Sequence, residues 1–331
     1  MKIIIFLLLT VFISVHAEES PSPQYVRKLI KPYMNLLEVD RKALDEAKDK
    51  IELGKKLFYD KRLSGEKNIS CNSCHDLQKY GTGGEHYLKL KEDGKVFRDV
   101  PSIYNLKNFE IFGWSGETKK LNEKIGKSFL NPHEMNLKKE ADLIERINSI
   151  EGYRTLFKNT FPGTENPVSK DNAIIALEEF IKGLVTPAPI DKFLKGDDKA
   201  LTEIQLAGAL KFDNENCFSC HTGSSFGGQM IIKVGILEPW PNQKDQGYYE
   251  ISKDPAHKMA FRVSPLRNVE KTAPYFHDAS SKRIWDAVRK MARYELGKHM
   301  SLKEIHQIQE FLKSMTGEIP EEYIKEPELP D

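Results

Sequence analysis

The chain has 331 residues, of which 30% are charged and 39% hydrophobic, and its formal net charge at pH 7 is +1. These fractions are ordinary for a globular protein, and the length allows about two domains. The balanced charge argues against nucleic acid as a partner, while it still permits a local charged patch that docks a small protein.

The first 17 residues have the features of a secretory signal peptide. Lys2 supplies the positive start, Ile3 to Val15 form a short apolar stretch, and Val15-His16-Ala17 resembles a cleavage site. The stretch is shorter than the roughly 20 residues of a membrane span, and no other long apolar run follows. We therefore expect an exported, periplasmic protein with no membrane span after cleavage; an uncleaved anchor is the alternative.

Hydrophobic periodicity indicates a helical chain. Apolar residues recur at helical spacing over residues 40–58 and 140–158, and residues 172–184 form an apolar stretch typical of a buried helix. Ser301 and Glu304 form a capping box for a last helix that runs to Lys313. No alternating strand pattern stands out, so the sequence predicts a mainly α fold with few or no strands.

All four cysteines lie in two copies of one motif, Cys71-Asn72-Ser73-Cys74-His75 and Cys217-Phe218-Ser219-Cys220-His221. In C-x-x-C-H, both thiols bond to a c-type haem and the histidine ligates its iron. Zinc ribbons place their second cysteine pair about 15–20 residues after the first, far closer than here. The sequence therefore favours two covalent haems over zinc, a redox dithiol or disulfides. The expected iron ligands are His75 and His221.

The surroundings of the two motifs repeat. Gly54 to Phe58 precede the first motif as Gly208 to Phe212 precede the second, both with glycine four residues before phenylalanine. The pattern F-R-x-x-P follows each motif, from Phe97 and from Phe261. This order indicates a duplicated, cytochrome c-like unit with one haem in each half.

The best boundary between the halves is Thr186-Pro187-Ala188-Pro189, because proline stops a helix. We expect a signal peptide at 1–17, an N-terminal haem domain at 18–186 and a C-terminal haem domain at 187–319. The charged, proline-rich segment 320–331 is expected to be an extended tail.

The second axial ligand of each iron decides what the haem does. A methionine raises the reduction potential and suits electron transfer, whereas an open position lets a small molecule bind. Five methionines follow the second motif, and spacing alone does not choose among them because methionine on a helix is more often a core residue. They are Met230, Met259, Met291, Met300 and Met315.

Several further motifs occur in a characteristic order. They are Leu53-Gly54-Lys55-Lys56-Leu57-Phe58-Tyr59-Asp60, Gly113-Trp114-Ser115-Gly116, Asn131-Pro132-His133-Glu134-Met135, Phe193-Leu194-Lys195-Gly196-Asp197, and Ser264 to Asp278 with its Tyr275-Phe276-His277-Asp278 end. With these motifs the chain resembles the bacterial dihaem cytochrome c peroxidases and their MauG relatives over nearly its whole mature length.

The resemblance implies unequal haems. The haem on Cys71, Cys74 and His75 would bind peroxide at low potential, and the haem on Cys217, Cys220 and His221 would receive electrons. Met291 would be the sixth ligand of the second haem; MauG enzymes carry a tyrosine there, so methionine favours the peroxidase branch.

The resemblance also implies roles for Trp114 and Glu134. Trp114 matches a tryptophan between the haems and would conduct electrons, the alternative being a core aromatic. Glu134 matches the acid of the peroxide pocket and would move a proton between the peroxide oxygens, the alternative being a solvated residue at a helix start.

A calcium ion between the domains is implied by the same resemblance. Its ligands would be the side chain of Asp99 and the carbonyls of Thr272 and Pro274. Aspartate is a hard oxygen ligand and suits calcium. The alternative is a surface aspartate beside an ordinary proline turn.

The chain departs from the family in the peroxide pocket. Many members carry a distal histidine in the loop that matches Leu90 to Lys95, which has none here; His86 lies earlier and is a candidate distal ligand. Without such a ligand, the first haem would be open even when oxidised. Lys124 stands where some relatives have glutamine, and Glu117 where others have arginine.

The sequence as a whole predicts a peroxidase that reduces hydrogen peroxide to water with electrons from a small cytochrome c or cupredoxin. It leaves a homodimer open as the assembly. One alternative is a MauG-like oxidase acting on a protein substrate. The other is a dihaem electron-transfer cytochrome that is not an enzyme.

Overall fold

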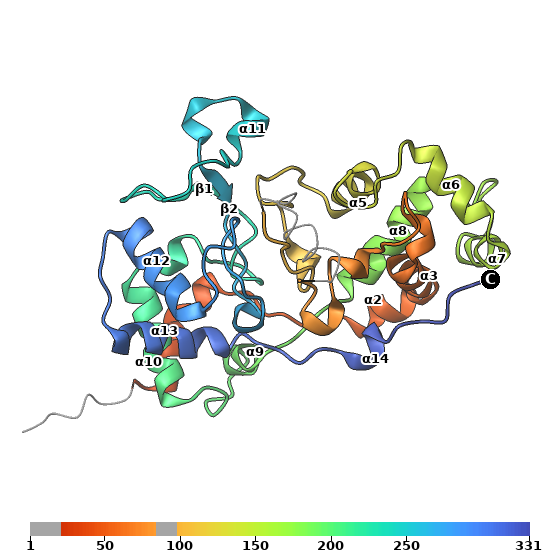
Figure 1. Ribbon diagram of the computed structural model, residues 1–331. Helices are drawn as coiled ribbons and strands as arrows, with labels where there is room; N and C mark the ends of the chain where they lie inside the picture. The colour runs from red at the N-terminus through yellow and green to blue at the C-terminus, as the bar shows by residue number, and fades with distance from the viewer. Residues whose placement is uncertain (1–20, 84–97) are drawn as a thin grey trace, which may run out of the picture.

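The computed structural model describes residues 21–83 and 98–331. These residues form two helical lobes (Figure 1). The first lobe contains α2 (Arg41–Glu46), α3 (Lys48–Tyr59), α5 (Leu121–Leu130), α6 (Glu140–Asn148), α7 (Glu151–Thr160) and α8 (Lys170–Lys182). The second contains α1 (Pro23–Ile30), α9 (Pro189–Leu194), α10 (Glu203–Asn214), β1 (Ile231–Lys233), α11 (Tyr249–Ser252), β2 (Ala260–Arg262), α12 (Ile284–Leu296) and α13 (Leu302–Lys313).

The prediction of a mainly α fold with few strands is confirmed. In the described residues, the only sheet pairs β1 with β2 antiparallel, with Ile231 opposite Arg262. None of the described helices is both long and apolar enough to cross a membrane. The predicted signal peptide and His86 lie outside the described residues.

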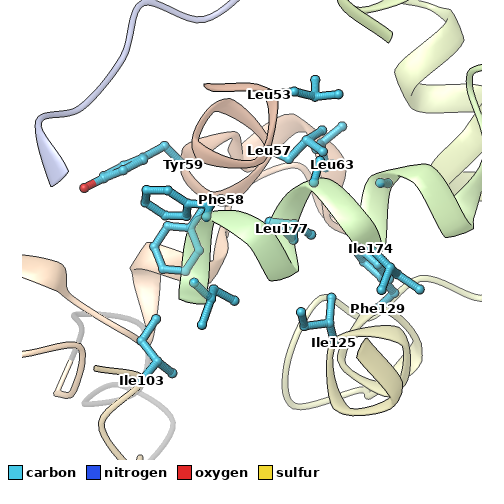
Figure 2. Packing of buried hydrophobic residues seen from close by; sticks show 14 of the residues in the cluster. Leu53, Leu57, Phe58, Tyr59, Leu63, Ile103, Ile125, Phe129, Ile174 and Leu177 are labelled. Carbon is cyan, nitrogen blue, oxygen red and sulfur yellow. The ribbon is translucent and has the colours of Figure 1, made fainter. Parts of the chain in front are cut away.

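The core of the first lobe is the crossing of α3 over α8. Leu57 and Phe58 of α3 face Leu177 of α8, and Ile125 and Phe129 of α5 pack beneath them (Figure 2). These side chains are all buried, so the amphipathic faces expected from the sequence meet in one apolar cluster.

Close approach of these helices depends on Gly54. A Cβ atom at this position would lie 1.9 Å from the carbonyl oxygen of Ala176 on α8. The second lobe repeats the arrangement: a Cβ at Gly208 of α10 would lie 1.9 Å from the carbonyl oxygen of Gln307 on α13. Both glycines stand four residues before a buried phenylalanine, Phe58 or Phe212, so the repeated sequence pattern encodes the same helix crossing twice.

The two ends of the chain each cross to the opposite half. Val26 and Ile30 of α1 are fully buried in the core cluster of the second lobe. The C-terminal segment runs back along the first lobe, where Ile324 is buried and the Tyr323 ring stacks on Phe180 (Figure 1). The domain limits 18–186 and 187–319 remain a prediction. In the structure, the N-terminal helix α1 packs in the second lobe and the C-terminal segment packs on the first.

The tail also differs from a fully extended chain. It contains a short helix, α14 (Glu321–Ile324), before an irregular end. Arg62 of the first lobe donates a hydrogen bond to the Pro330 carbonyl at 2.8 Å, and the backbone N–H of Gly152 donates to the Asp331 carbonyl at 3.0 Å. The tail is therefore held to the first lobe almost to its last residue.

Two predicted helices are each interrupted. The stretch 40–58 divides into α2 and α3 at Ala47, whose ψ is 7°. The stretch 140–158 divides into α6 and α7 at Ile150, whose φ of −108° and ψ of 112° are extended. The Ser149 hydroxyl just before it donates to the Arg146 carbonyl at 2.7 Å. The capping box of Ser301 and Glu304 is present as predicted.

Candidate functional site

Each C-x-x-C-H motif folds as a single 3-10 turn. In the first, Cys71–Ser73, the backbone N–H of Cys74 and of His75 both donate to the Cys71 carbonyl, at 3.2 and 2.9 Å. In the second, Cys217–Ser219, Cys220 and His221 donate to the Cys217 carbonyl in the same way, at 3.3 and 3.1 Å. The two motifs thus have the same local geometry.

Both motif histidines are anchored through Nδ1. The Nδ1 atom of His75 lies 3.0 Å from the Gly81 carbonyl oxygen, and that of His221 lies 3.2 Å from the Phe226 carbonyl oxygen. A ring that donates from Nδ1 keeps the Nε2 lone pair for a metal. Burial lowers the pKa of both imidazoles, which favours the neutral form that ligates iron.

A cavity of about 140 Å³ opens beside the first motif. Cys71, Cys74, His75 and Glu134 all line it. The structure therefore brings the predicted attachment residues of the first haem and the predicted proton-transfer residue into one pocket.

The walls of this cavity are mainly apolar and come from several elements. Besides the four residues above, the lining consists of Phe58, Ile69, Ser70, Pro101, Ser102, Ile103, Leu106, Phe109, Phe112, Gly113, Leu121, Lys124, Ile125, Ser128, Met135, Leu177, Ile181 and Arg262. An apolar pocket with few polar groups suits the macrocycle of a haem.

Glu134 lies in the turn that follows α5. Its backbone N–H donates to the Asn131 carbonyl at 3.0 Å, and the Asn131 side-chain amide donates to Glu134 Oε1 at 2.8 Å. The Lys124 ammonium lies 3.4 Å from the same oxygen. With two donors on Oε1, the carboxylate has a defined orientation at the cavity wall.

Arg262 was not predicted as a site residue, yet it reaches the cavity of the first lobe from β2 of the second. Its Nε donates to the Gly113 carbonyl at 3.0 Å, its side chain is buried, and no partner for Nη1 is recorded among the described residues. Burial lowers the pKa of this guanidinium to about 10. The Glu117 carboxylate acts on this charge from nearby, and the unpartnered Nη1 fits a haem, whose carboxylates would accept from it. In the sequence, the one feature that singled out Arg262 was its place in the repeated F-R-x-x-P pattern.

Trp114 lies where the two lobes meet. Its indole N–H donates to the Asp99 carbonyl at 2.7 Å, and its own carbonyl accepts from the backbone N–H of Arg262 at 2.8 Å. The His277 ring is 6.4 Å away, centroid to centroid. Trp114 is therefore in contact with residues of both halves.

The remaining predicted ligands are less clearly assembled. Met291 is half-buried on α12, and the described contacts do not join it to His221. Of the other methionines, Met315 and Met259 are buried in core clusters.

The predicted calcium ligands include one buried carboxylate. Asp99 is buried, and its backbone N–H donates to the His277 carbonyl at 2.7 Å. Within residues 21–83 and 98–331, no group of three or more His, Cys, Asp or Glu side chains is placed to hold a metal ion. A calcium site here would thus depend on carbonyl oxygens such as those of Thr272 and Pro274.

Two similar helical lobes, each with an anchored C-x-x-C-H turn, define a protein built for two c-type haems. A family model described as di-haem cytochrome c peroxidase matches residues 48–199. The cytochrome c551 peroxidase of Pseudomonas aeruginosa is 37% identical over 279 residues, 81% of this chain and 79% of that protein. The cytochrome c551 peroxidase of Nitrosomonas europaea is 35% identical over 290 residues, 86% of this chain and 84% of that protein.

MauG relatives are also similar. The methylamine utilization protein MauG of Methylophilus methylotrophus is 28% identical over 283 residues, 81% of this chain and 83% of that protein. The crystal structure of a MauG-like protein associated with microbial copper homeostasis has a TM-score of 0.72 at 24% identity, covering 84% of this chain and 93% of that one, and supports the fold.

The chain belongs to the bacterial dihaem cytochrome c peroxidase/MauG family, with two c-type haems. It is an oxidoreductase of the cytochrome c peroxidase type.

Proposed function

We propose that the protein reduces hydrogen peroxide to water at the haem held by Cys71, Cys74 and His75. The observation that carries this proposal is the single cavity lined by both His75 and Glu134. When bound, the haem supplies an iron that engages peroxide and electrons that break its O–O bond. Apolar walls would exclude bulk water from the reaction.

Glu134 is the general acid–base group of this proposal. A carboxylate takes the proton of one peroxide oxygen and returns it to the other, which then leaves as water. The complete reduction uses two electrons and two protons from solvent and yields two molecules of water. The orientation of Glu134 by Asn131 and Lys124 holds the group in position for this transfer.

The second haem, on Cys217, Cys220 and His221, would receive electrons, with Met291 as its sixth ligand. Trp114 lies at the junction of the lobes and would carry electrons between the haems. The donor would be a small cytochrome c or cupredoxin, and the protein would act in the periplasm. Asp99, Thr272 and Pro274 would bind a calcium ion at the same junction.

A MauG-like oxidase acting on a protein substrate is the second candidate, favoured by the similarity to the curated MauG proteins. The identity of residue 291 favours the peroxidase, because methionine suits a haem that takes electrons from a donor.

Replacing Glu134 with glutamine tests the proposal. We expect Glu134→Gln to retain both haems and lose about 10²–10⁴-fold in peroxide turnover with a reduced small cytochrome c, the usual contribution of a general acid–base group. Glu123→Gln, at an exposed position of α5, is the matched control and should keep the wild-type rate. A near-normal rate in Glu134→Gln would return this residue to a structural role.

A further inference from the structure

We propose that Lys124 is a positioning residue of the peroxide pocket, which fixes Glu134 and makes a subsite for a small anion, the hydroperoxide ion. The inference rests on the proposed function of the cavity beside His75. Since the resemblance places glutamine at this position in some relatives, the charge would be a particular property of this chain.

Lys124 lies on the cavity face of α5. Leu121 and Ile125, three residues before it and one after, are each 8% exposed and line the same cavity. The regular pattern of an amphipathic helix would place an apolar side chain between them. A lysine at this position moves its ammonium partly out of water, which is unfavourable unless an anion faces it.

The charges around the cavity are unbalanced. Apart from the motif residues, the ionisable side chains that line it are Lys124, Glu134 and Arg262. Two cations and one carboxylate thus line the cavity. Glu117 lies outside the lining and also acts on the Arg262 charge, while Nη1 of Arg262 has no recorded hydrogen-bond partner in the described part of the chain. The cavity therefore favours the arrival or the formation of a negative charge.

The hydrogen bonds leave one oxygen of Glu134 for the substrate. Asn131 donates to Oε1 at 2.8 Å and Lys124 approaches Oε1 at 3.4 Å. No donor to Oε2 is recorded among the residues that the structure describes. Oε2 is therefore the atom that accepts a substrate proton, and Lys124 holds the carboxylate by its other oxygen.

The chemistry follows from these positions. An O–H bond of hydrogen peroxide breaks, its proton moves to Oε2, and the electron pair stays on the hydroperoxide oxygen. The Lys124 ammonium stabilises this new negative charge at close range. When the O–O bond breaks, Glu134 returns the proton to the outer oxygen, which leaves as the first water. The bound haems would supply two electrons, which with two solvent protons complete the reduction of the remaining oxygen to a second water.

Azide is a suitable probe because it is a small anion and binding requires no turnover. The dissociation constant is measured from the haem absorption spectrum, with the protein fully oxidised and half-reduced. Lys124→Gln should raise this dissociation constant about tenfold. A tenfold change corresponds to only a small part of the attraction between an ammonium and a nearby anion in a partly buried site. Lys124→Arg should stay near wild type, and Glu134→Gln should bind azide more tightly because a competing carboxylate is gone.

Lys127→Gln is the control on the same helix, since Lys127 is exposed and donates to the Glu117 carbonyl at 3.0 Å. The proposal is overturned if Lys124→Gln and Lys127→Gln have the same azide affinity, or if wild type binds no azide in either redox state. If Lys124→Gln fails to retain haem, Lys124→Met replaces it in the test and must bind azide about tenfold more weakly than wild type. Failure of the peroxidase itself would show differently, as wild-type protein that binds azide but does not turn over peroxide.

Discussion

At the scale of single residues, Arg262 is a buried side chain whose Nη1 has no recorded hydrogen-bond partner among the described residues. It is 4% exposed, it lines a pocket in the opposite lobe, and no ion pair is recorded for it within the described residues. A nearby positive charge disfavours the oxidised, more positive state of a haem and so raises its reduction potential.

Removing this charge should therefore lower the potential of the first haem. For Arg262→Gln we predict a fall of about 60 mV or more, equivalent to a tenfold change in the one-electron equilibrium, in a spectroelectrochemical titration. Arg262→Lys should recover most of the shift. Arg154→Gln, an exposed position, is the control for loss of one positive charge. If the potential of the first haem is the same in Arg262→Gln and Arg154→Gln, Arg262 does not lie close to that haem.

Met291 should affect only the other haem. Loss of a methionine ligand lowers a haem potential, so Met291→Leu should lower the potential of the second haem and slow turnover with the electron donor. Met300→Leu, beside the core of the second lobe, is the control. A titration in which Met291→Leu leaves both potentials unchanged would remove this residue as a ligand.

At the scale of helices, Gly54 and Gly208 account for the internal repeat. Alanine is intrinsically better in a helix than glycine by about 1 kcal/mol. At both positions, however, a Cβ would meet a backbone carbonyl oxygen at 1.9 Å, and a backbone atom moves only with its helix. Packing should therefore outweigh helix propensity.

We predict that Gly54→Ala and Gly208→Ala each lower the free energy of unfolding by about 1–3 kcal/mol, the usual cost of overpacking, in urea titrations. Gly126→Ala on α5 is the control, because the nearest atom there is the terminal methyl group of Ile174 at 3.3 Å, which can move. Stabilisation by Gly54→Ala or Gly208→Ala would mean that the helices do not cross this closely.

The helical class and the haem motifs could be predicted because they depend on local patterns. C-x-x-C-H is read within five residues, and the capping box of Ser301 and Glu304 within four. The sequence could not show that Arg262 enters the opposite lobe, because only the tertiary fold joins it to Gly113. The breaks at Ala47 and Ile150 were also missed, since both lie within continuous apolar periodicity.

At the scale of the whole molecule, the exchanged ends join the two lobes. The C-terminal tail leaves the second lobe after α13 and runs along the first (Figure 1), where it contacts Tyr59 of α3 and Phe180 of α8. Ile324 is 1% exposed, and the Tyr59 hydroxyl donates to its carbonyl at 2.5 Å. Stability of the first lobe should therefore depend on residues at the far end of the sequence.

We predict that Ile324→Ala destabilises the first lobe by about 2–5 kcal/mol, the range for a buried isoleucine. In hydrogen exchange, protection should fall in α3 and α8 more than in α10 and α13. Leu302→Ala, at a position that is 81% exposed, should change neither lobe. Uniform loss of protection in both lobes would show that they unfold as one unit.

The central claim is that the two haems are unequal, with a ligand-accessible iron above His75. Electron paramagnetic resonance of the oxidised protein tests it most directly. Because the sequence has no histidine at the matching position of the loop, we predict a high-spin ferric signal from the first haem and a low-spin signal from the second, and only the low-spin signal should change in Met291→Leu. Two low-spin signals in the oxidised protein, with no high-spin signal after half-reduction, would contradict an open peroxide site.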